Sequence, residues 1–306
     1  MSPGVLILAG QTASGKSALA LEIAERFDAE IVGADSRQVY RGMPIGTAAP
    51  TAADRARVRH HLVGFVDPRE RYSAARFVTD ALRAIDDITG RGKRALVVGG
   101  TGFYLRALSG GVRLSDAYDA GLRDRLAREA RIHPVETLAE WLHAVAPARA
   151  AAVPARDAYR ITRALEIALS ERDAGDDPAV SANAVSNLRA RGIAARTLYL
   201  EIAPDELQRR IVARTDAMLA AGLLDEAERI GGDAFAADAV GYREALAFLA
   251  GWSTRAELRE QLIRSTRRYA KRQATWFRAE TDLVRVPAER ALEATSELAG
   301  ALPGWA

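Results

Sequence analysis

The 306-residue chain contains no cysteine, which excludes disulfides, cysteine–zinc sites, iron–sulfur clusters and thiol nucleophiles and fits a cytoplasmic location. Lysine is scarce as well, because only three lysines stand beside 40 arginines. No apolar run is long enough to cross a membrane, and the short run at residues 5–9 lacks the features of a signal peptide. The formal net charge of +3 is too small to indicate a nucleic-acid partner by itself.

Strand and helix patterns alternate over the first hundred residues. Short apolar runs typical of buried strands lie at 5–8, 29–34 and 95–98, and helical patterns lie at 17–27 and 73–88. This alternation predicts a parallel α/β sheet flanked by helices.

The pattern changes near residue 114, where strand signals disappear until residue 197. Helices are expected within this stretch, and the α/β pattern then returns to the end of the chain. We therefore expect a core made of residues 1–113 and 193–306, interrupted by a mainly helical insertion at 114–192.

A glycine-rich segment, GQTASGKS at residues 10–17, matches the P-loop pattern GxxxxGKS/T at every fixed position. It lies between a predicted strand and a predicted helix, which is the context this pattern requires. Backbone N–H groups and the helix N-terminus can surround a phosphate, Lys16 adds a full charge, and the Ser17 hydroxyl can bind Mg²⁺. The expected fold class is therefore a P-loop nucleotide-hydrolase-like α/β fold that binds a diphosphate or a longer phosphate chain.

Two further strand ends carry candidate site residues. Asp35 follows the second predicted strand, and GGTG at 99–102 follows the third. Because the carboxyl ends of parallel strands share one edge of the sheet, we expect both beside the P-loop. Asp35 could act as a general base or position Mg²⁺, whereas GGTG supplies no second carboxylate of the kind that P-loop nucleotidases use.

A nucleotide kinase, an ATPase and a transferase with a diphosphate leaving group would all need the P-loop, and the missing second carboxylate argues against the ATPase. Together with the basic segment 255–278, described below, the residues leave three functions open. A small-molecule kinase would use Asp35 as the base for a hydroxyl acceptor. A P-loop RNA-binding module would leave Asp35 without a catalytic task. A transferase with a diphosphate leaving group would use both the P-loop and the carboxylate.

Several longer motifs resemble the tRNA dimethylallyltransferases, also called tRNA isopentenyltransferases. They span nearly the whole chain and include ADSRQVYRGMPIGTAAP at 34–50, HHLVGFVDP at 60–68, VVGGTGFYL at 97–105, RITRALEI at 160–167, VGYREAL at 240–246 and STRRYAKRQATWFR at 265–278. The resemblance implies transfer of a dimethylallyl group from dimethylallyl diphosphate to N6 of the adenosine just 3′ of the anticodon. It also implies release of diphosphate, a requirement for Mg²⁺, and a tRNA anticodon stem-loop as partner.

The resemblance also implies residue roles. Asp35 matches the general base, Arg214 matches an arginine that stabilises the departing diphosphate, and Lys16 belongs to the same catalytic set. The diphosphate site would comprise Gly10, Gln11, Thr12, Ala13, Ser14, Gly15, Lys16 and Ser17, with Ser17 as the metal ligand. The matching tRNA contacts are Asp35, Ser36, Arg37, Gln38, Thr101, Arg123, Tyr159, Arg160, Ile161, Thr162 and Arg163.

Three positions depart from the family pattern. Gln11 replaces a common proline, Ala49 stands where lysine is usual, and Tyr159 replaces a frequent glutamine. The last two departures concern phosphate or tRNA contacts.

The segment 255–278 is a predicted helix with eight basic residues. Arg268 and Lys271 lie on one face of it, which suits an RNA backbone. His60 and His61 have no third ligand at metal spacing, so we expect no metal there. A self-contained core and a tRNA-sized partner favour a monomer.

Overall fold

The computed structural model describes residues 4–112, 114, 120–173 and 185–305. The chain forms two compact units, one of residues 1–112 with 186–306 and one of residues 113–185. The second boundary therefore lies at 185, not at 192 as the sequence suggested. Residues 186–192 belong to the larger unit because the Leu188 N–H donates to the Leu108 carbonyl at 2.9 Å and Arg191 pairs with Asp86 at 2.9 Å.

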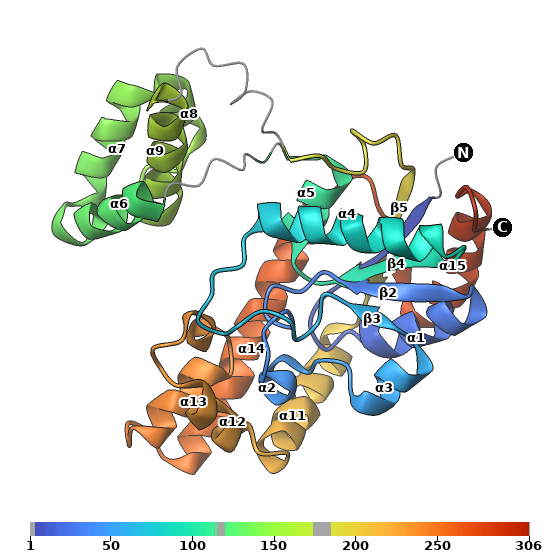
Figure 1. The fold of residues 1–306 in the computed structure, drawn as a ribbon. Helices are drawn as coiled ribbons and strands as arrows, with labels where there is room; N and C mark the ends of the chain where they lie inside the picture. The colour runs from blue at the N-terminus through green and yellow to red at the C-terminus, as the bar shows by residue number, and fades with distance from the viewer. Residues whose placement is uncertain (1–3, 113, 115–119, 174–184, 306) are drawn as a thin grey trace. The chain divides into compact units, whose positions relative to one another are not determined.

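The larger unit is built on a sheet whose described strands all run parallel, which confirms the predicted fold class (Figure 1). The strand order is β3-β2-β4-β1-β5-β6. The strands are β1 (Val5–Gly10), β2 (Ala29–Gly33), β3 (His60–His61), β4 (Arg94–Gly99), β5 (Ala195–Glu201) and β6 (Val284–Pro287). The strand that leads into the P-loop is thus central and has neighbours on both sides.

Helices cover both faces of this sheet. Helix α4 packs on one face and buries Phe77 and Ile85, while α1 and α15 pack on the other, where Ile23 joins Leu6 and Leu8 in one apolar cluster (Figure 1). The helices of this unit are α1 (Lys16–Arg26), α2 (Pro44–Thr47), α3 (Ala52–Arg57), α4 (Ala74–Gly90), α5 (Gly102–Ser109), α11 (Pro204–Ala220), α12 (Leu223–Ile230), α13 (Tyr242–Leu249), α14 (Arg255–Arg278) and α15 (Ala291–Gly300), with 3₁₀ turns η1 (Phe235–Asp238) and η2 (Ala288–Arg290).

Several short elements of the larger unit were not predicted. They are β3, α2, α3, α12 and α13. β3 has two residues, and α2 has four residues that begin at a proline. Segments this short carry too few residues for a hydrophobic period to be recognised.

The smaller unit is helical, as predicted. Its helices are α6 (Ala120–Ile132), α7 (Val135–Val145), α8 (Pro147–Ala152) and α9 (Ala158–Asp173). Its core is formed by Leu122, Leu126, Leu138, Leu142, Ile161 and Leu165. These side chains supply this unit with an apolar core of its own.

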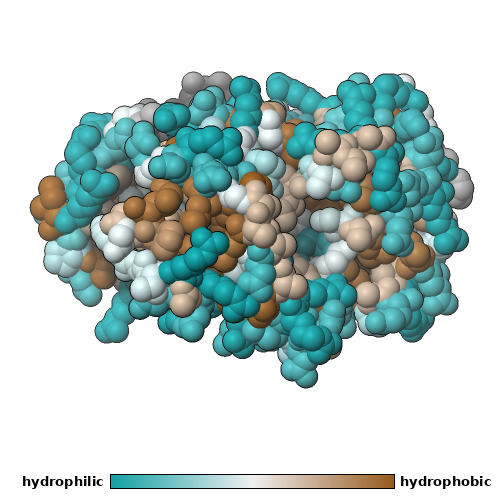
Figure 2. Space-filling view, turned by 90° about the horizontal axis from the view of Figure 1, so that it is seen from below, coloured by the Kyte–Doolittle hydropathy of each residue, from teal (hydrophilic) through white to brown (hydrophobic). Residues whose placement is uncertain are grey.

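Hydrophilic residues dominate the face seen in Figure 2, with apolar residues distributed among them. Large apolar side chains with high exposure include Trp252 at 83% and Ile132 at 72%. In the part of the chain that the structure describes, no helix is both long and apolar enough to span a bilayer.

Candidate active site

The P-loop connects the central strand to its following helix, as the motif predicts. β1 ends at Gly10, α1 begins at Lys16, and both Ala13 (φ 62°) and Gly15 (φ 98°) adopt left-handed backbone conformations. Such alternation lets successive N–H groups converge on an anion. Gly15 is also crowded, because a Cβ there would lie 2.8 Å from Arg210 Nη1, which donates to the Ser14 carbonyl at 3.0 Å.

Lys16 lines a cavity of about 430 Å³ above this loop. Its Nζ donates to the Gln11 carbonyl at 2.7 Å. Burial lowers the pKa of Lys16 to about 8; Asp35 opposes the shift and Arg214 adds to it. A phosphate in the cradle would favour the charged ammonium, because an adjacent anion stabilises it.

Asp35 lines the same cavity, one residue beyond the buried Ala34 that follows β2. Its Oδ1 accepts the N–H groups of Arg37 at 2.8 Å and Gln38 at 3.3 Å. Among the described residues, no protein donor bonds to Oδ2. This carboxylate is therefore oriented by the backbone through one oxygen and can accept a proton through the other.

The glycine turn after β4 lies directly against the Asp35 segment. The Thr101 Oγ1 accepts the Ser36 N–H at 3.0 Å. A Cβ on Gly99 would lie 2.0 Å from the Ala34 carbonyl oxygen, so only glycine permits this approach. Ser36, Arg37 and Gln38 line the cavity together with Asp35, so the predicted cluster at this sheet edge is present.

Arg214 reaches the cavity from α11, far away in the sequence. Its Nη1 donates to Thr12 Oγ1 at 3.0 Å and its Nη2 to the Thr47 carbonyl at 3.4 Å. Burial lowers its pKa, and the negative charge of Asp35 opposes this shift. Two cations, Lys16 and Arg214, thus lie beside the phosphate cradle.

Gln273 is a site residue that the sequence reasoning did not single out. Its Oε1 accepts the Thr12 N–H at 2.8 Å, and its Nε2 donates to the Gly100 carbonyl at 2.9 Å. It therefore joins the P-loop to the glycine turn. The sequence feature that could have indicated it is a polar residue on the buried face of α14, between Ala270 and Phe277.

Comparison with known proteins agrees with this site. A family model described as "IPP transferase" matches residues 38–280. The tRNA dimethylallyltransferase of Halorhodospira halophila is 42% identical to this chain, over 99% of this chain and 100% of the relative. The chain belongs to the IPP transferase family. A second relative, the tRNA dimethylallyltransferase of Geobacter metallireducens, is also 42% identical, over 92% of this chain and 91% of its own length.

Solved structures of IPP transferases share the fold. The tRNA isopentenylpyrophosphate transferase of Bacillus halodurans is 33% identical, with a TM-score of 0.70 and coverage of 97% of this chain and 96% of its own. A eukaryotic dimethylallyltransferase described as acting on tRNA is 26% identical, with a TM-score of 0.81 and coverage of 99% and 81%. The likeness therefore extends over both compact units of this chain.

The basic helix of this IPP transferase exposes most of its cations. Arg268 and Lys271 line a second, more open cavity of about 460 Å³, together with Arg272, Thr275 and Trp276. Arg268 Nη2 donates to Ser265 Oγ at 2.9 Å, and the Lys271 side chain is exposed. The role of these two cations as RNA contacts stays a prediction.

The residues predicted to contact tRNA in the helical unit differ in their exposure and in their contacts within the unit. Ile161 is 1% exposed and its side chain packs in the unit's core, and its assignment as a tRNA contact stays a prediction. Arg123 and Arg163 both pair with the buried Glu166, and the Thr162 hydroxyl donates to the Ala158 carbonyl at 2.7 Å.

Tyr159 and Arg160 are the two predicted contacts in that unit that are exposed, whereas Arg123, Thr162 and Arg163 are partly exposed. Tyr159 is 81% exposed. Arg160 is exposed as well and pairs with Asp157 at 3.2 Å.

The residues of the cavity fit a Mg²⁺ ion. Mg²⁺ prefers oxygen ligands and usually retains waters beside one or two protein ligands and substrate phosphates. Ser17 and Asp35 offer such oxygens to the same cavity. The Ser14 Oγ of the P-loop is buried and has no hydrogen-bond partner among the described residues. Within the described ranges, no group of three or more His, Cys, Asp or Glu residues could hold a metal.

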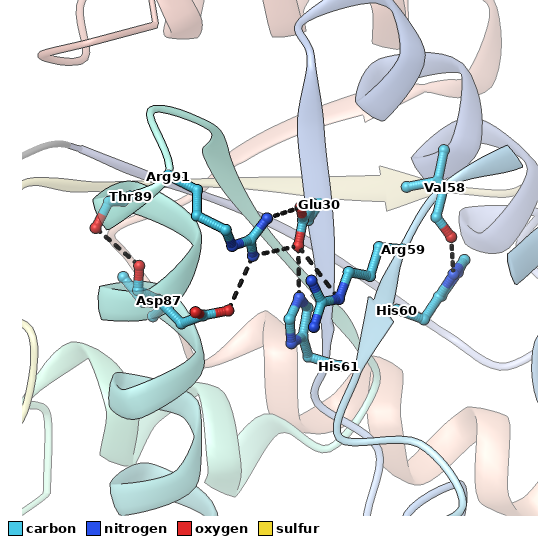
Figure 3. Close-up of polar contacts among 9 residues, drawn as sticks. Glu30, Val58, Arg59, His60, His61, Asp87, Thr89 and Arg91 are labelled. Carbon is cyan, nitrogen blue, oxygen red and sulfur yellow. Dashed lines mark hydrogen bonds and ion pairs between the residues drawn. The ribbon is translucent and has the colours of Figure 1, made fainter.

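The histidine pair forms part of a structural cluster at the other end of β2 (Figure 3). His61 Nε2 lies 2.7 Å from Glu30 Oε2, and Arg91 makes a bidentate contact with the same carboxylate. The Arg91 hydrogen bond outweighs burial and holds the pKa of Glu30 at about 2, with His61 contributing in the same direction. His60 instead lies 2.8 Å from the Val58 carbonyl.

Proposed function

We propose that this protein transfers a dimethylallyl group from dimethylallyl diphosphate to N6 of the adenosine 3′-adjacent to the anticodon of tRNA, with release of diphosphate. The observation that carries the proposal is one cavity that holds a phosphate cradle, two cations and an oriented carboxylate. The membership of the family supports the same reaction.

The cradle and its cations suit a diphosphate leaving group. As the bond between the allylic carbon and the diphosphate oxygen breaks, negative charge grows on the departing diphosphate. Lys16, Arg214 and the loop N–H groups would stabilise that charge, since preorganised donors act most strongly where charge develops. Mg²⁺ held by Ser17 and the donor phosphates would neutralise further charge on the same group, which leaves Asp35 Oδ2 free to act as the base.

Asp35 is proposed as the general base. The adenine N6 amine is a weak nucleophile, because its lone pair is delocalised into the ring. As N6 forms its bond to the allylic carbon, its proton would pass to Asp35 Oδ2, while Oδ1 stays bonded to the Arg37 and Gln38 N–H groups. The Asp35 carboxylate is thereby held in place during the transfer.

The target base must leave its stack to enter the cavity, as in other enzymes that act on bases. Anticodon-loop bases are loosely constrained, so this step requires little energy. We propose that Arg268 and Lys271 contact the RNA backbone and that the protein acts as a cytoplasmic monomer on the anticodon stem-loop.

The test is transfer of label from dimethylallyl diphosphate to unmodified tRNA with an A-rich anticodon loop. Asp35→Asn should retain the backbone bonds at Oδ1 but lose the base, so single-turnover transfer should fall by about 10²–10³-fold with tRNA affinity unchanged. Asp28→Asn, at the opposite end of β2, is the matched control and should transfer normally. ATP turnover without label transfer would instead favour the kinase, and tRNA binding without either activity would favour an RNA-binding module.

A further inference from the structure

A buried carboxylate on α12 has no task in the proposed reaction. Glu226 is 0% exposed. Its Oε2 accepts the Ile45 N–H at 3.0 Å, and its Oε1 accepts the Gly46 N–H at 2.8 Å and the Tyr242 hydroxyl at 2.6 Å. Within the described part of the chain, no Lys, Arg or His forms an ion pair with it. A buried charge of this kind is retained only where donors satisfy it, and here the donors are backbone groups of α2 and one phenol.

The two backbone N–H groups that donate to Glu226 belong to the first turn of α2, so Glu226 holds the start of this helix. Met43, the residue that precedes α2, supplies no side-chain cap, so the first N–H groups of this four-residue helix depend on Glu226 from another part of the chain. The Tyr242 ring packs directly against Gly46, because a Cβ on Gly46 would lie 2.5 Å from it. Burial and the neighbouring Glu226 raise the pKa of Tyr242, so the phenol remains a donor.

The held segment forms part of the cavity wall. Gly46, Thr47 and Ala48 all line the cavity. The Thr47 carbonyl accepts Arg214 Nη2 at 3.4 Å and Gln38 Nε2 at 3.1 Å. Thr47 is therefore one of the two hydrogen-bonded anchors of Arg214, the other being Thr12 in the P-loop.

We infer that Glu226 is a positioning residue that fixes the 45–48 segment and, through the Thr47 carbonyl, aims Arg214 at the departing diphosphate. This role rests on the proposed function of the cavity. It acts without contact with substrate, because the two N–H bonds and the phenol occupy the Glu226 oxygens. A displacement of about 1 Å at such a group is enough to change a rate by about 10²-fold.

The test uses Glu226→Gln, which keeps the shape but turns one amide –NH₂ toward an N–H group that needs an acceptor. We expect kcat to fall by about 10²-fold, with the KM for tRNA within about twofold of wild type. Tyr242→Phe removes the third donor but keeps both backbone bonds, so its kcat should fall by less than about tenfold. Glu30→Gln, another buried hydrogen-bonded carboxylate at the far end of β2, controls for loss of stability alone.

A double-mutant cycle decides whether Glu226 works through Arg214. If it does, Glu226→Gln should slow the Arg214→Ala protein by less than about twofold, although it slows wild type by about 10²-fold. If the rate losses of Glu226→Gln and Arg214→Ala instead multiply in the double mutant, the inference is overturned. It is also overturned if Glu226→Gln and Glu30→Gln have equal kcat values at the same degree of folding. A wild-type protein that transfers no label would refute the proposed function instead, so the two failures are distinguishable.

Discussion

Gly99→Ala should impair transfer by moving Asp35. The added Cβ would lie 2.0 Å from the Ala34 carbonyl oxygen and 2.7 Å from the Ala34 Cβ, against an ordinary contact of 3.4 Å or more. Residues 34 and 99 are both held by the sheet, since the Ala34 N–H donates to the carbonyl of Val98, the neighbour of Gly99, at 2.8 Å. Relief of the clash therefore requires the ends of β2 and β4 to separate by about 1 Å, which carries Asp35 with it.

The expected size of the effect follows from this displacement. Overpacking should lower the free energy of unfolding by about 1–3 kcal/mol. Misplacement of Asp35 by about 1 Å should lower single-turnover transfer by about 10²-fold. The assay is single-turnover transfer of labelled dimethylallyl to tRNA at saturating enzyme, with thermal unfolding measured on the same sample.

Gly90→Ala is the matched control, because a Cβ there would meet no atom within 4 Å. It lies at the end of α4 and should raise the free energy of unfolding by up to about 1 kcal/mol without changing transfer. If Gly99→Ala transfers within about threefold of wild type while folded, the proposed link between this glycine and the Asp35 position is refuted.

Three further predictions concern protonation and the Gln273 contact. Because the pKa of Lys16 is about 8, its ammonium loses its proton between pH 7 and 9, and affinity for inorganic pyrophosphate, measured by calorimetry, should fall over that range. Lys16→Arg should flatten this pH dependence. An equal slope in both proteins would contradict the role of Lys16. The pKa of Glu30 is lowered from 4.5 to about 2, so its charge stabilises the fold above pH 4.5, and this stabilisation is lost as pH falls toward 2. The difference in the free energy of unfolding between wild type and Glu30→Gln, measured in urea, should therefore close over that range. A constant difference would disprove the stabilising role of this charge. Gln273→Met removes both hydrogen bonds while keeping volume, so pyrophosphate affinity should fall about tenfold, and unchanged affinity would show that the P-loop needs no such support.

The phosphate side of the site could be predicted from the sequence because its signals are local. The P-loop, Asp35 and the glycine turn each lie at the end of a strong strand pattern, and parallel topology brings such ends together. Arg214 was assigned through the family resemblance alone, since its helix gives no local indication of the distant Thr12 that it contacts.

Other contacts could not be predicted because they depend on tertiary packing. Glu226 lies on an eight-residue helix that sequence reasoning missed, and its backbone partners are about 180 positions away. The burial of Ile161 was not predicted, because a motif resemblance selects consecutive residues, whereas a helix turns every third or fourth one toward its core.

The way in which the smaller unit joins the chain makes it removable. The Val185 N–H donates to the Leu114 carbonyl at 3.1 Å, so these two described residues, which lie on either side of the helices in the sequence, are neighbours in space. A short glycine-containing loop could therefore replace the helices between these residues without stretching the sheet. Measuring the tRNA affinity of a protein shortened in this way would test whether the helical unit contributes to tRNA binding at all.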